Sequence, residues 1–278
     1  MNGNALVAER PTTGAGSGAS TPVTDGLAVL GRHLQRIKAA PGVLILTQTM
    51  PIMMLLFFGY VFGSALAVPG QEYRSFLVPG LLAATAANGI MTGMFQSAQD
   101  CHRGVMDRFR TLPMSRSAVP FGQTSADLLT TAVGMIPLVL AGLAVGWRIE
   151  GGPAAATGAF GLLMLFRFAT SWVGCWLGLL IRNEEAAGQL GAATFVLPLL
   201  SSAYIPTSNL PGWLRVLAEW NPISAVASAV RDLVGNTAPA ADSAWPVAHP
   251  VAGALLWSAV LLAVAVPLSS RRYARGGE

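Results

Sequence analysis

The chain has 278 residues, of which 53% are hydrophobic and 11% are charged, and its mean hydropathy is +0.55. Because about 25% of the residues in an average soluble domain are charged, this composition excludes an ordinary cytosolic globular protein and favours a membrane protein. The net charge of +4 is small and scattered, so it does not indicate a nucleic-acid partner.

Residues 1–25 are rich in Gly, Ser, Thr and Pro and contain no apolar stretch. This composition predicts a disordered cytoplasmic tail and not a signal peptide. The remainder, residues 26–278, is expected to form one transmembrane domain. Its two cysteines, Cys101 and Cys175, are far apart in the sequence, so we expect two free thiols and no disulfide framework.

The segment just before the first apolar stretch predicts an amphipathic helix. Four aliphatic side chains recur at helical spacing, and three basic side chains lie elsewhere on the same helix: Leu27, Leu30, Leu34 and Ile37 against Arg32, Arg36 and Lys38. A basic amphipathic helix of this kind usually lies in the headgroup layer at the inner face of a membrane. A plain soluble helix is the alternative.

Long stretches without charge predict six transmembrane helices, each of about 20 residues or more, which is the length that crosses a bilayer. We expect these spans at about residues 43–66, 75–97, 127–147, 155–181, 186–204 and 248–269. Asp127 stands at one end of the third span, and the fourth contains Arg167. The predicted fold class is therefore an all-α integral membrane protein.

The distribution of Lys and Arg predicts that both termini are cytoplasmic, because cytoplasmic segments of membrane proteins retain these residues. In this orientation twelve basic residues fall on the inner side and four on the outer side, with Arg167 inside a span. The twelve are Arg10, Arg32, Arg36, Lys38, Arg103, Arg108, Arg110, Arg116, Arg182, Arg271, Arg272 and Arg275, and the four are Arg74, Arg148, Arg215 and Arg231.

The loop between the second and third spans, residues 98–125, contains a second amphipathic pattern. The apolar side chains share one face of a predicted helix: Val105, Met106, Phe109 and Leu112. The charged side chains lie on the opposite side: Arg103, Asp107 and Arg110, with Arg108 beside them. Pro113 ends this helix. Such a short helix, with apolar anchors and a charged rim, is typical of a docking site for a soluble partner. The alternative is that the arginines only set the topology. The next cytoplasmic loop adds an acidic pair, Glu184 and Glu185.

Three segments carry a resemblance to a known family: "RFRTLPMSRSAV" before the third span, "LLIRNEEAAGQLG" after the fourth, and "YIPTSNLPGWLRVLAEWNPISAVASAVRDLVGN" before the last. From about Leu27 onward the chain resembles the membrane permease of a type-2 ABC exporter of the daunorubicin/doxorubicin-resistance type. The resemblance implies a six-span permease that dimerises and binds two copies of a cytoplasmic ABC ATPase subunit. It also implies that Arg103 to Pro113 contact the ATPase, with Glu184 and Glu185 beside them.

The sequence contains no G-x-x-x-x-G-K-[ST] phosphate-binding loop, and its only lysine is Lys38. We therefore expect that this chain is not an enzyme. ATP and magnesium would be bound by the partner ATPase, and this chain would hold no cofactor and no metal.

The outer segment, residues 205–247, is too apolar for an ordinary loop. Asn209 and Pro211 precede one predicted helix, Asn221 and Pro222 separate it from a second, and Gly235 ends the second. Trp213, Leu217 and Trp220 share one side of the first helix, a pattern typical of a membrane interface. The family resemblance implies that this pair is re-entrant and closes the transport path on the outside. A pair of interfacial helices without a gating role is the alternative.

Three features inside the spans are candidates for function or for packing. Arg167 lies near the middle of a span, where a charge costs about 2.5 to 3.5 kcal/mol, so we expect it to face protein, a carboxylate or water. Gly174 and Gly178 form a G-x-x-x-G pair that favours close helix packing, more readily inside one subunit than between two. The side chains of Met50, Met53, Met54 and Phe57 form a soft surface that suits either an apolar cargo or lipid, and together with Arg167 they are the predicted lining of a substrate path.

The sequence thus predicts the permease subunit of an ATP-driven exporter that moves a hydrophobic small molecule, such as a drug, antibiotic or lipid, out of a bacterial cell. Its expected partners are the ABC ATPase, a second permease copy in a homodimer, and membrane lipid. One alternative is an ion-coupled secondary transporter, for which Arg167 is the only support. An intramembrane enzyme is disfavoured, because His33, His102 and His249 lie outside the spans or at their edges and no catalytic motif is present.

Overall fold

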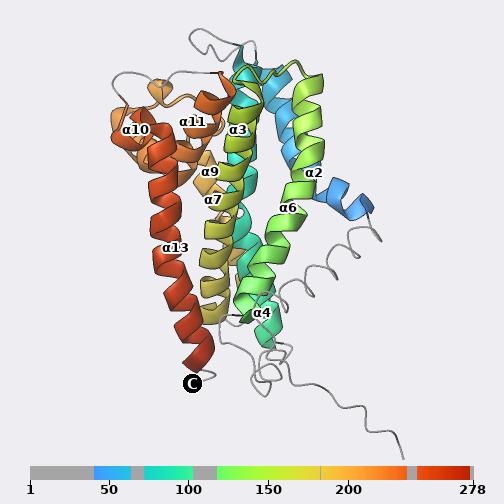
Figure 1. Ribbon diagram of the computed structural model, residues 1–278, viewed down its shortest axis with the longest axis vertical. Helices are drawn as coiled ribbons and strands as arrows, with labels where there is room; N and C mark the ends of the chain where they lie inside the picture. The colour runs from blue at the N-terminus through green and yellow to red at the C-terminus, as the bar shows by residue number, and fades with distance from the viewer. Residues whose placement is uncertain (1–40, 64–71, 103–117, 182, 237–242, 276–278) are drawn as a thin grey trace, which may run out of the picture.

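The computed structural model describes residues 41–63, 72–102, 118–181, 183–236 and 243–275. Within these ranges the chain forms an elongated bundle of helices with no β-strand (Figure 1). The last helix, α13, ends near the lower end of the bundle in Figure 1, whereas the short helices α10 and α11 lie near the upper end.

The helices follow one another along the chain with few long connections. They are α2 (Pro41–Leu56), the π-helix η1 (Phe57–Phe62), α3 (Tyr73–Ala87), α4 (Gly89–His102), α6 (Ala118–Ala144), α7 (Gly152–Ile181), α8 (Glu184–Ala193), α9 (Val196–Leu199), the 3-10 helix η2 (Thr207–Asn209), α10 (Gly212–Trp220), α11 (Pro222–Val234), α12 (Trp245–Ala248) and α13 (Pro250–Arg275).

Four of the described helical stretches are long and apolar enough to cross a membrane: Tyr73–His102, Pro120–Ala144, Gly152–Ile181 and Pro250–Arg272. They correspond to the second, third, fourth and sixth predicted spans. The first predicted span lies on α2 and η1, whose apolar part, Gln48–Val61, is shorter. The fifth lies on α8 and α9, which a turn separates. These helices make the chain a multi-pass membrane protein.

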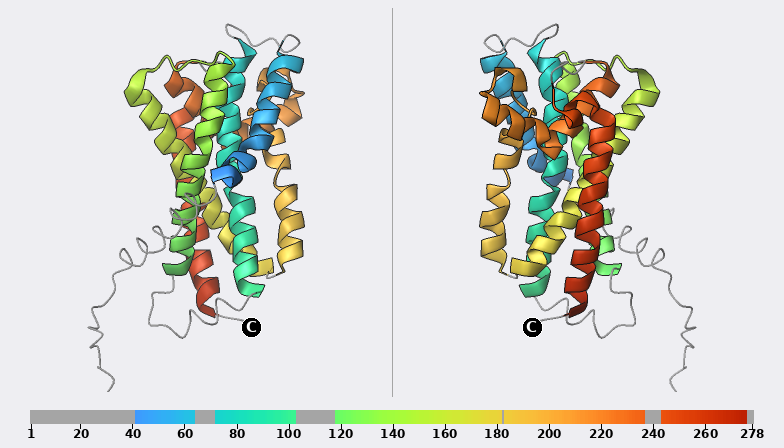
Figure 2. Two further views of the ribbon diagram at one scale, coloured as in Figure 1. Left: turned by 90° about the vertical axis from the view of Figure 1, so that its right-hand side faces the viewer. Right: turned by 90° about the vertical axis from the view of Figure 1, so that its left-hand side faces the viewer.

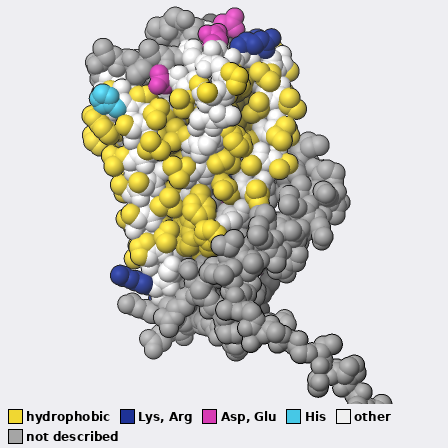
Figure 3. Space-filling model, viewed as in Figure 1, with side chains coloured by type: hydrophobic (Ala, Val, Ile, Leu, Met, Phe, Trp, Pro, Cys, Tyr) yellow, Lys and Arg dark blue, Asp and Glu magenta, His cyan; other side chains and the backbone are white. Residues whose placement is uncertain are grey.

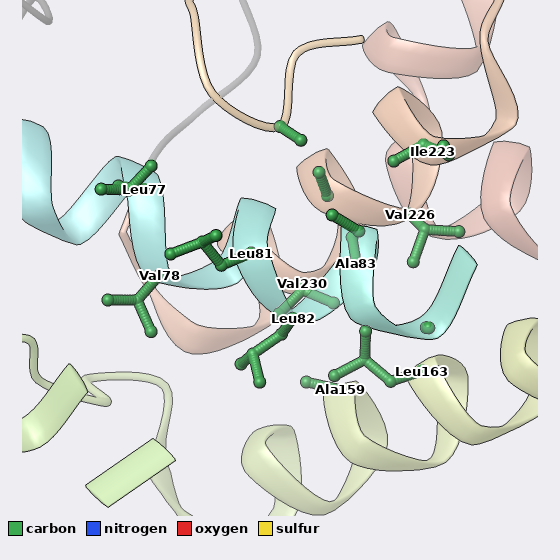
Figure 4. Close-up of a cluster of buried hydrophobic side chains, with 14 of the residues drawn as sticks. Leu77, Val78, Leu81, Leu82, Ala83, Ala159, Leu163, Ile223, Val226 and Val230 are labelled. Atoms are coloured by element: carbon green, nitrogen blue, oxygen red, sulfur yellow. The ribbon is translucent and has the colours of Figure 1, made fainter. Parts of the chain in front are cut away.

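The core of the bundle is built around α3. Thirteen of its 15 residues are buried, and its side chains meet those of α7 and α11, as Figure 4 shows for Leu82, Leu163 and Val230. Because lipid tails are as apolar as the core, such packing is stabilised mainly by close van der Waals contact, which small residues permit. The four alanines among the last five residues of α3, Ala83–Ala87, serve this purpose.

Close packing is most extensive between α4 and α7, which have glycines on the surfaces that meet. A Cβ atom at Gly174 would clash with the carbonyl oxygen of Ile90, and one at Gly178 would clash with that of Met94. On the other helix, a Cβ atom at Gly93 would lie 2.5 Å from a carbonyl oxygen of α7. The prediction that Gly174 and Gly178 pack inside one subunit is therefore confirmed.

The outer surface of the bundle is largely hydrophobic. The face in Figure 3 is dominated by hydrophobic side chains, with charged side chains near its two ends. Exposed large apolar side chains occur on α2, α6, α10 and α13 and along α8 and α9. Figure 2 places α8 and α9 along one edge of the bundle, next to α4. An apolar middle with charges toward the ends is the surface expected of a protein embedded in lipid.

Candidate functional site

Most of the predicted docking residues lie outside the described residues: Arg103, Val105, Met106, Asp107, Arg108, Phe109, Arg110, Leu112 and Pro113. The same is true of the predicted amphipathic helix before the first span. The structure does describe the two helices that flank the docking segment. α4 leads into it at His102, and α6 begins after it at Ala118.

The acidic pair, Glu184 and Glu185, occupies the first turn of α8. Asn183 caps this helix, because its side-chain oxygen accepts hydrogen bonds from the backbone N–H groups of Glu185 and Ala186 at 2.9 and 3.2 Å. Glu184 also accepts a hydrogen bond of 2.9 Å from the amide of Gln99 near the end of α4. Acidic residues stabilise a helix N-terminus, so this pair has a structural role besides any contact with a partner.

The predicted substrate-path residues on α2 and η1 fall into two environments. Met50, Met53 and Phe57 are each more than half exposed, whereas Met54 packs partly against the core. Arg167, which was predicted together with them, is 4% exposed and lies inside the bundle. The structure therefore does not bring Arg167 to the same surface as the three exposed side chains.

Arg167 and Asp127 form a buried ion pair. Asp127 accepts two hydrogen bonds from the guanidinium, from Nε at 2.8 Å and from Nη2 at 2.6 Å, and the two side chains are 5% and 8% exposed. Such a bidentate pair is among the strongest polar contacts in proteins. The expectation that Arg167 faces protein or a carboxylate is confirmed.

Further polar groups complete this site. Arg167 donates to the carbonyl oxygen of Thr85 in the last turn of α3 at 3.1 Å and to the hydroxyl of Thr92 on α4 at 2.9 Å. Ser171, one turn along α7 from Arg167, donates to Asp127 at 2.6 Å. The site therefore joins four helices, α3, α4, α6 and α7, at the level where Asn88 interrupts the second span.

The outer segment contains the predicted helix pair. Asn209 ends the 3-10 helix η2, Pro211 immediately precedes α10, and α11 starts at Pro222. Asn221 caps α11 by accepting from the N–H of Ile223 at 2.9 Å, which confirms the predicted break. Trp213 and Trp220 are 70% and 53% exposed. The helix pair thus presents indole rings outward, as the interface pattern predicted.

Gly235 ends α11 as predicted. Its φ of +80° places it in the left-handed region, where glycine is the favoured residue, and its N–H bonds back to the last turn of the helix. Cys175 is buried, and its sulfur accepts a hydrogen bond of 3.4 Å from the hydroxyl of Ser269.

A second buried arginine, Arg231 on α11, was not recognised from the sequence. It is 3% exposed, and it donates to the carbonyl oxygens of Phe76 at 3.0 Å and Ser202 at 2.8 Å. Its guanidinium carbon also lies 3.6 Å from the centre of the Phe76 ring. Residue types do not show which backbone oxygens will accept from a side chain. The only feature of the sequence that could have indicated this site is an arginine within an apolar segment.

Glu219 on α10 is also buried and charged, and it holds the outer segment together. Its carboxylate accepts hydrogen bonds from Arg215 at 2.7 Å, from the hydroxyl of Thr207 at 3.1 Å and from the N–H of Ala244 at 2.7 Å. These contacts connect η2, α10 and the start of α12. Within the described residues, no group of three His, Cys, Asp or Glu side chains is arranged to hold a metal ion.

Comparison with known proteins shows the family. The ABC-2 type transporter family matches residues 25–234. The chain belongs to this family. It is 34% identical to a daunorubicin resistance ABC transporter permease protein of Streptomyces coeruleorubidus over 91% of this chain and 87% of that protein.

More distant relatives carry similar names. A Mycobacterium tuberculosis protein named "probable doxorubicin resistance ABC transporter permease protein" is 22% identical over 79% of this chain and 78% of its own length. An Escherichia coli protein named "probable multidrug ABC transporter permease" is 27% identical over 56% of this chain and 42% of its own length. The family resemblance recognised in the sequence is confirmed: the chain is a transporter's membrane permease and not itself an enzyme.

Proposed function

We propose that this ABC-2 family member is the permease subunit of an ATP-driven exporter that moves a hydrophobic small molecule, such as a drug, antibiotic or lipid, out of a bacterial cell. The observation that carries the proposal is the 34% identity to a daunorubicin resistance permease across nearly the whole chain. The apolar surface and long apolar helices of the bundle support it.

In the proposed arrangement the chain has six spans and both termini in the cytoplasm. α2 with η1 would form the first span and α8 with α9 the fifth, in addition to the four long helices. The lower end of Figure 1 would then be cytoplasmic. The excess of basic residues in the segments predicted to be cytoplasmic supports this orientation.

The motor would be a separate ABC ATPase in two copies, bound to a homodimer of this permease, with ATP and magnesium held by the ATPase. We place its docking site on residues 103–113, with Glu184 and Glu185 beside it. Two observations support this placement: α4 leads directly into that segment, and Glu184 is hydrogen-bonded to α4 through Gln99. Residues 103–113 and the acidic pair would then form one surface that faces the ATPase.

At the other end, α10 and α11 would form a re-entrant outer gate that includes Asn209, Pro211, Trp213, Trp220, Asn221 and Pro222. The exposed indoles and the cap at Asn221 support two short helices at the membrane surface. The cargo would pass the exposed surface of Met50, Met53 and Phe57, which can adapt to varied apolar shapes.

The alternative of an ion-coupled carrier depended on Arg167 alone. The structure engages this guanidinium with Asp127, Thr85 and Thr92, so no observation now favours that alternative.

The test is to purify the tagged permease from its native membrane in mild detergent, identify the proteins that copurify, and measure ATP hydrolysis. We expect an ABC ATPase with the wild-type protein and its loss with Phe109→Ala and Arg110→Glu. Phe160→Ala and Arg148→Glu, which change exposed residues away from the cytoplasmic side, are the matched controls and should retain the ATPase. Wild-type protein that arrives intact without an ATPase would contradict the proposal.

A further inference from the structure

The cluster of Thr92, Asp127, Arg167 and Ser171, in which Thr92 is partly buried and the other three are buried, has no counterpart in the docking or gating roles described above. We call it the mid-membrane brace. It lies at a break in the second span. α3 ends at Ala87, Asn88 adopts φ −60° and ψ −4°, and α4 starts at Gly89. Inside a membrane every backbone polar group must be satisfied within the protein, so a break in a helix needs partners for its carbonyl oxygens.

Side chains of α7 provide those partners. Arg167 donates to the carbonyl oxygen of Thr85 at 3.1 Å, and the hydroxyl of Thr170 donates to that of Ala86 at 2.9 Å. A Cβ atom at Gly89 would clash with the Thr170 hydroxyl, which shows how closely the start of α4 approaches α7. The end of α3 and the start of α4 are thus both fixed to α7.

Thr92 connects α4 to the ion pair itself. Its hydroxyl accepts from Arg167 at 2.9 Å. Its own proton can go to Asp127 at 3.3 Å or to the carbonyl oxygens of Asn88 and Gly89, also at 3.3 Å. Through this one side chain, α4 is joined to α6 and to α7.

The position of the brace along α4 and α6 indicates a role in transmitting movement between these helices. α4 ends at His102 and α6 begins at Ala118, on either side of residues 103–117, which include the proposed docking site of the ATPase. Farther into the membrane the same two helices meet again at Thr92 and Asp127. Between these two points α4 and α6 share only limited contact, including 3.4 Å between the Ser97 hydroxyl and Gln123. The brace therefore links α4 and α6 at a distance from the ends at which the docking segment begins and finishes.

We propose that Thr92, Asp127 and Arg167 are positioning residues that make α4, α6 and α7 move as one body. A displacement of residues 103–117 would then move the parts of these three helices at the middle of the membrane by the same amount. This inference rests on the proposed function, because the displacement would come from the ATPase. Without the brace, α4 and α6 would separate during the stroke, and ATP would be hydrolysed with little cargo moved.

The variant that tests this is Thr92→Val, which keeps the shape of the side chain and removes the hydroxyl. Thr124→Val is its control, since the Thr124 hydroxyl bonds to the carbonyl oxygens of Pro120 and Phe121 in its own helix and to no other helix that the structure describes. In vesicles containing the permease and its ATPase, we expect daunorubicin transported per ATP to fall about tenfold in Thr92→Val, with little change in ATP hydrolysis. Thr124→Val should match the wild type.

A second measurement does not depend on the cargo. Spin labels at His102→Cys and Phe121→Cys, with Cys101 and Cys175 replaced by Ser, report the distance between the lower ends of α4 and α6. We expect one narrow distribution that ATP with vanadate leaves unchanged in the wild type and in Thr124→Val. In Thr92→Val the same treatment should broaden it.

The double variant Asp127→Asn with Arg167→Gln removes both charges together, so it avoids leaving one buried charge unpaired. We expect it to be as uncoupled as Thr92→Val. Transport per ATP at the wild-type level, in Thr92→Val or in a folded double variant, would contradict the proposed role of the brace. An increase in the distance between the two spin labels in the wild type on addition of ATP and vanadate would also contradict it. Loss of the ATPase from wild-type protein is a different result, because it would contradict the proposed function and the brace with it.

Discussion

Arg167 and Arg231 are both buried in the bundle, yet the protein accommodates their charges in different ways. Arg167 lies half-way along α7 and pairs with a carboxylate through two hydrogen bonds. Arg231 lies in the outer segment, and its bonds go to the backbone oxygens of Phe76, Ser202 and Ala203, with the ring of Phe76 against its face.

The difference follows from what each site needs to satisfy. Apart from the carbonyl oxygen of Thr85, the acceptors around Arg167 are side chains, and Asp127 supplies the negative charge. At Arg231 the neighbouring chain, Leu200–Tyr204, has left the helical path, so its carbonyl oxygens need donors. One arginine is held by a charge, and the other stabilises an irregular segment.

Asp127→Ala should have the largest effect, because it leaves Arg167 buried without its carboxylate. Breaking a buried ion pair from one side costs about 3–5 kcal/mol of unfolding free energy. Thermal unfolding in detergent, followed by size-exclusion chromatography with fluorescence detection, measures this loss. The double variant Asp127→Leu with Arg167→Met should recover most of it. If Asp127→Ala alone unfolds like the wild type, the ion pair does not stabilise the bundle.

Arg231→Met should come next, since it removes the donors to Phe76 and Ser202 but leaves no charge unpaired. Buried acceptors without partners cost about 1–3 kcal/mol each, so we expect a loss of about 2–3 kcal/mol. The effect should be local to the outer segment. Trypsin cleavage after Arg215 should become about tenfold faster, because local opening exposes that site. Cleavage that accelerates equally at the lower end of the bundle would argue against a local role.

Gly80→Ala should disturb the same site without touching the arginine. A Cβ atom at Gly80 would clash with the carbonyl oxygen of Ala203 and lie 2.8 Å from Nη2 of Arg231. Overpacking of this kind costs about 1–3 kcal/mol. The matched control is Gly161→Ala on α7, where a Cβ atom meets nothing within 4 Å, and there we expect a gain of about 0.5–1 kcal/mol. Equal melting temperatures for the two variants would contradict the close approach.

The sequence predicted those features that have a local pattern. The charge-free stretches located the long helices, the Asn221–Pro222 pair predicted the start of α11, and Gly235 predicted its end. The G-x-x-x-G spacing predicted close packing, although the partner helix, α4, was not identified from it. Each of these signals acts within a few residues, where chain geometry and composition decide the structure.

Pairings across the bundle could not be read in the same way. Asp127 and Arg167 were both noticed as charges near or in the spans, but 40 residues separate them, and only the packing of α6 against α7 makes them partners. Arg231 was assigned to an outer loop because charge counting treats every arginine alike. Whether an arginine is exposed or buried against carbonyl oxygens depends on neighbours 155 residues away, as with Phe76.

Of these variants, Arg148→Met should have the smallest effect on stability. It tests most directly whether burial decides what an arginine bonded to backbone oxygens contributes. Arg148 also donates to backbone oxygens, those of Leu143 at 2.9 Å and Trp147 at 3.0 Å, yet it is exposed in the segment that follows α6. Water can replace these bonds, so we expect a change within about 0.5 kcal/mol and unchanged trypsin cleavage after Arg215. Arg148→Met and Arg231→Met thus remove the same chemistry from an exposed and a buried position. If both variants lose equal stability in the same thermal assay, the number of hydrogen bonds decides the effect, and burial does not.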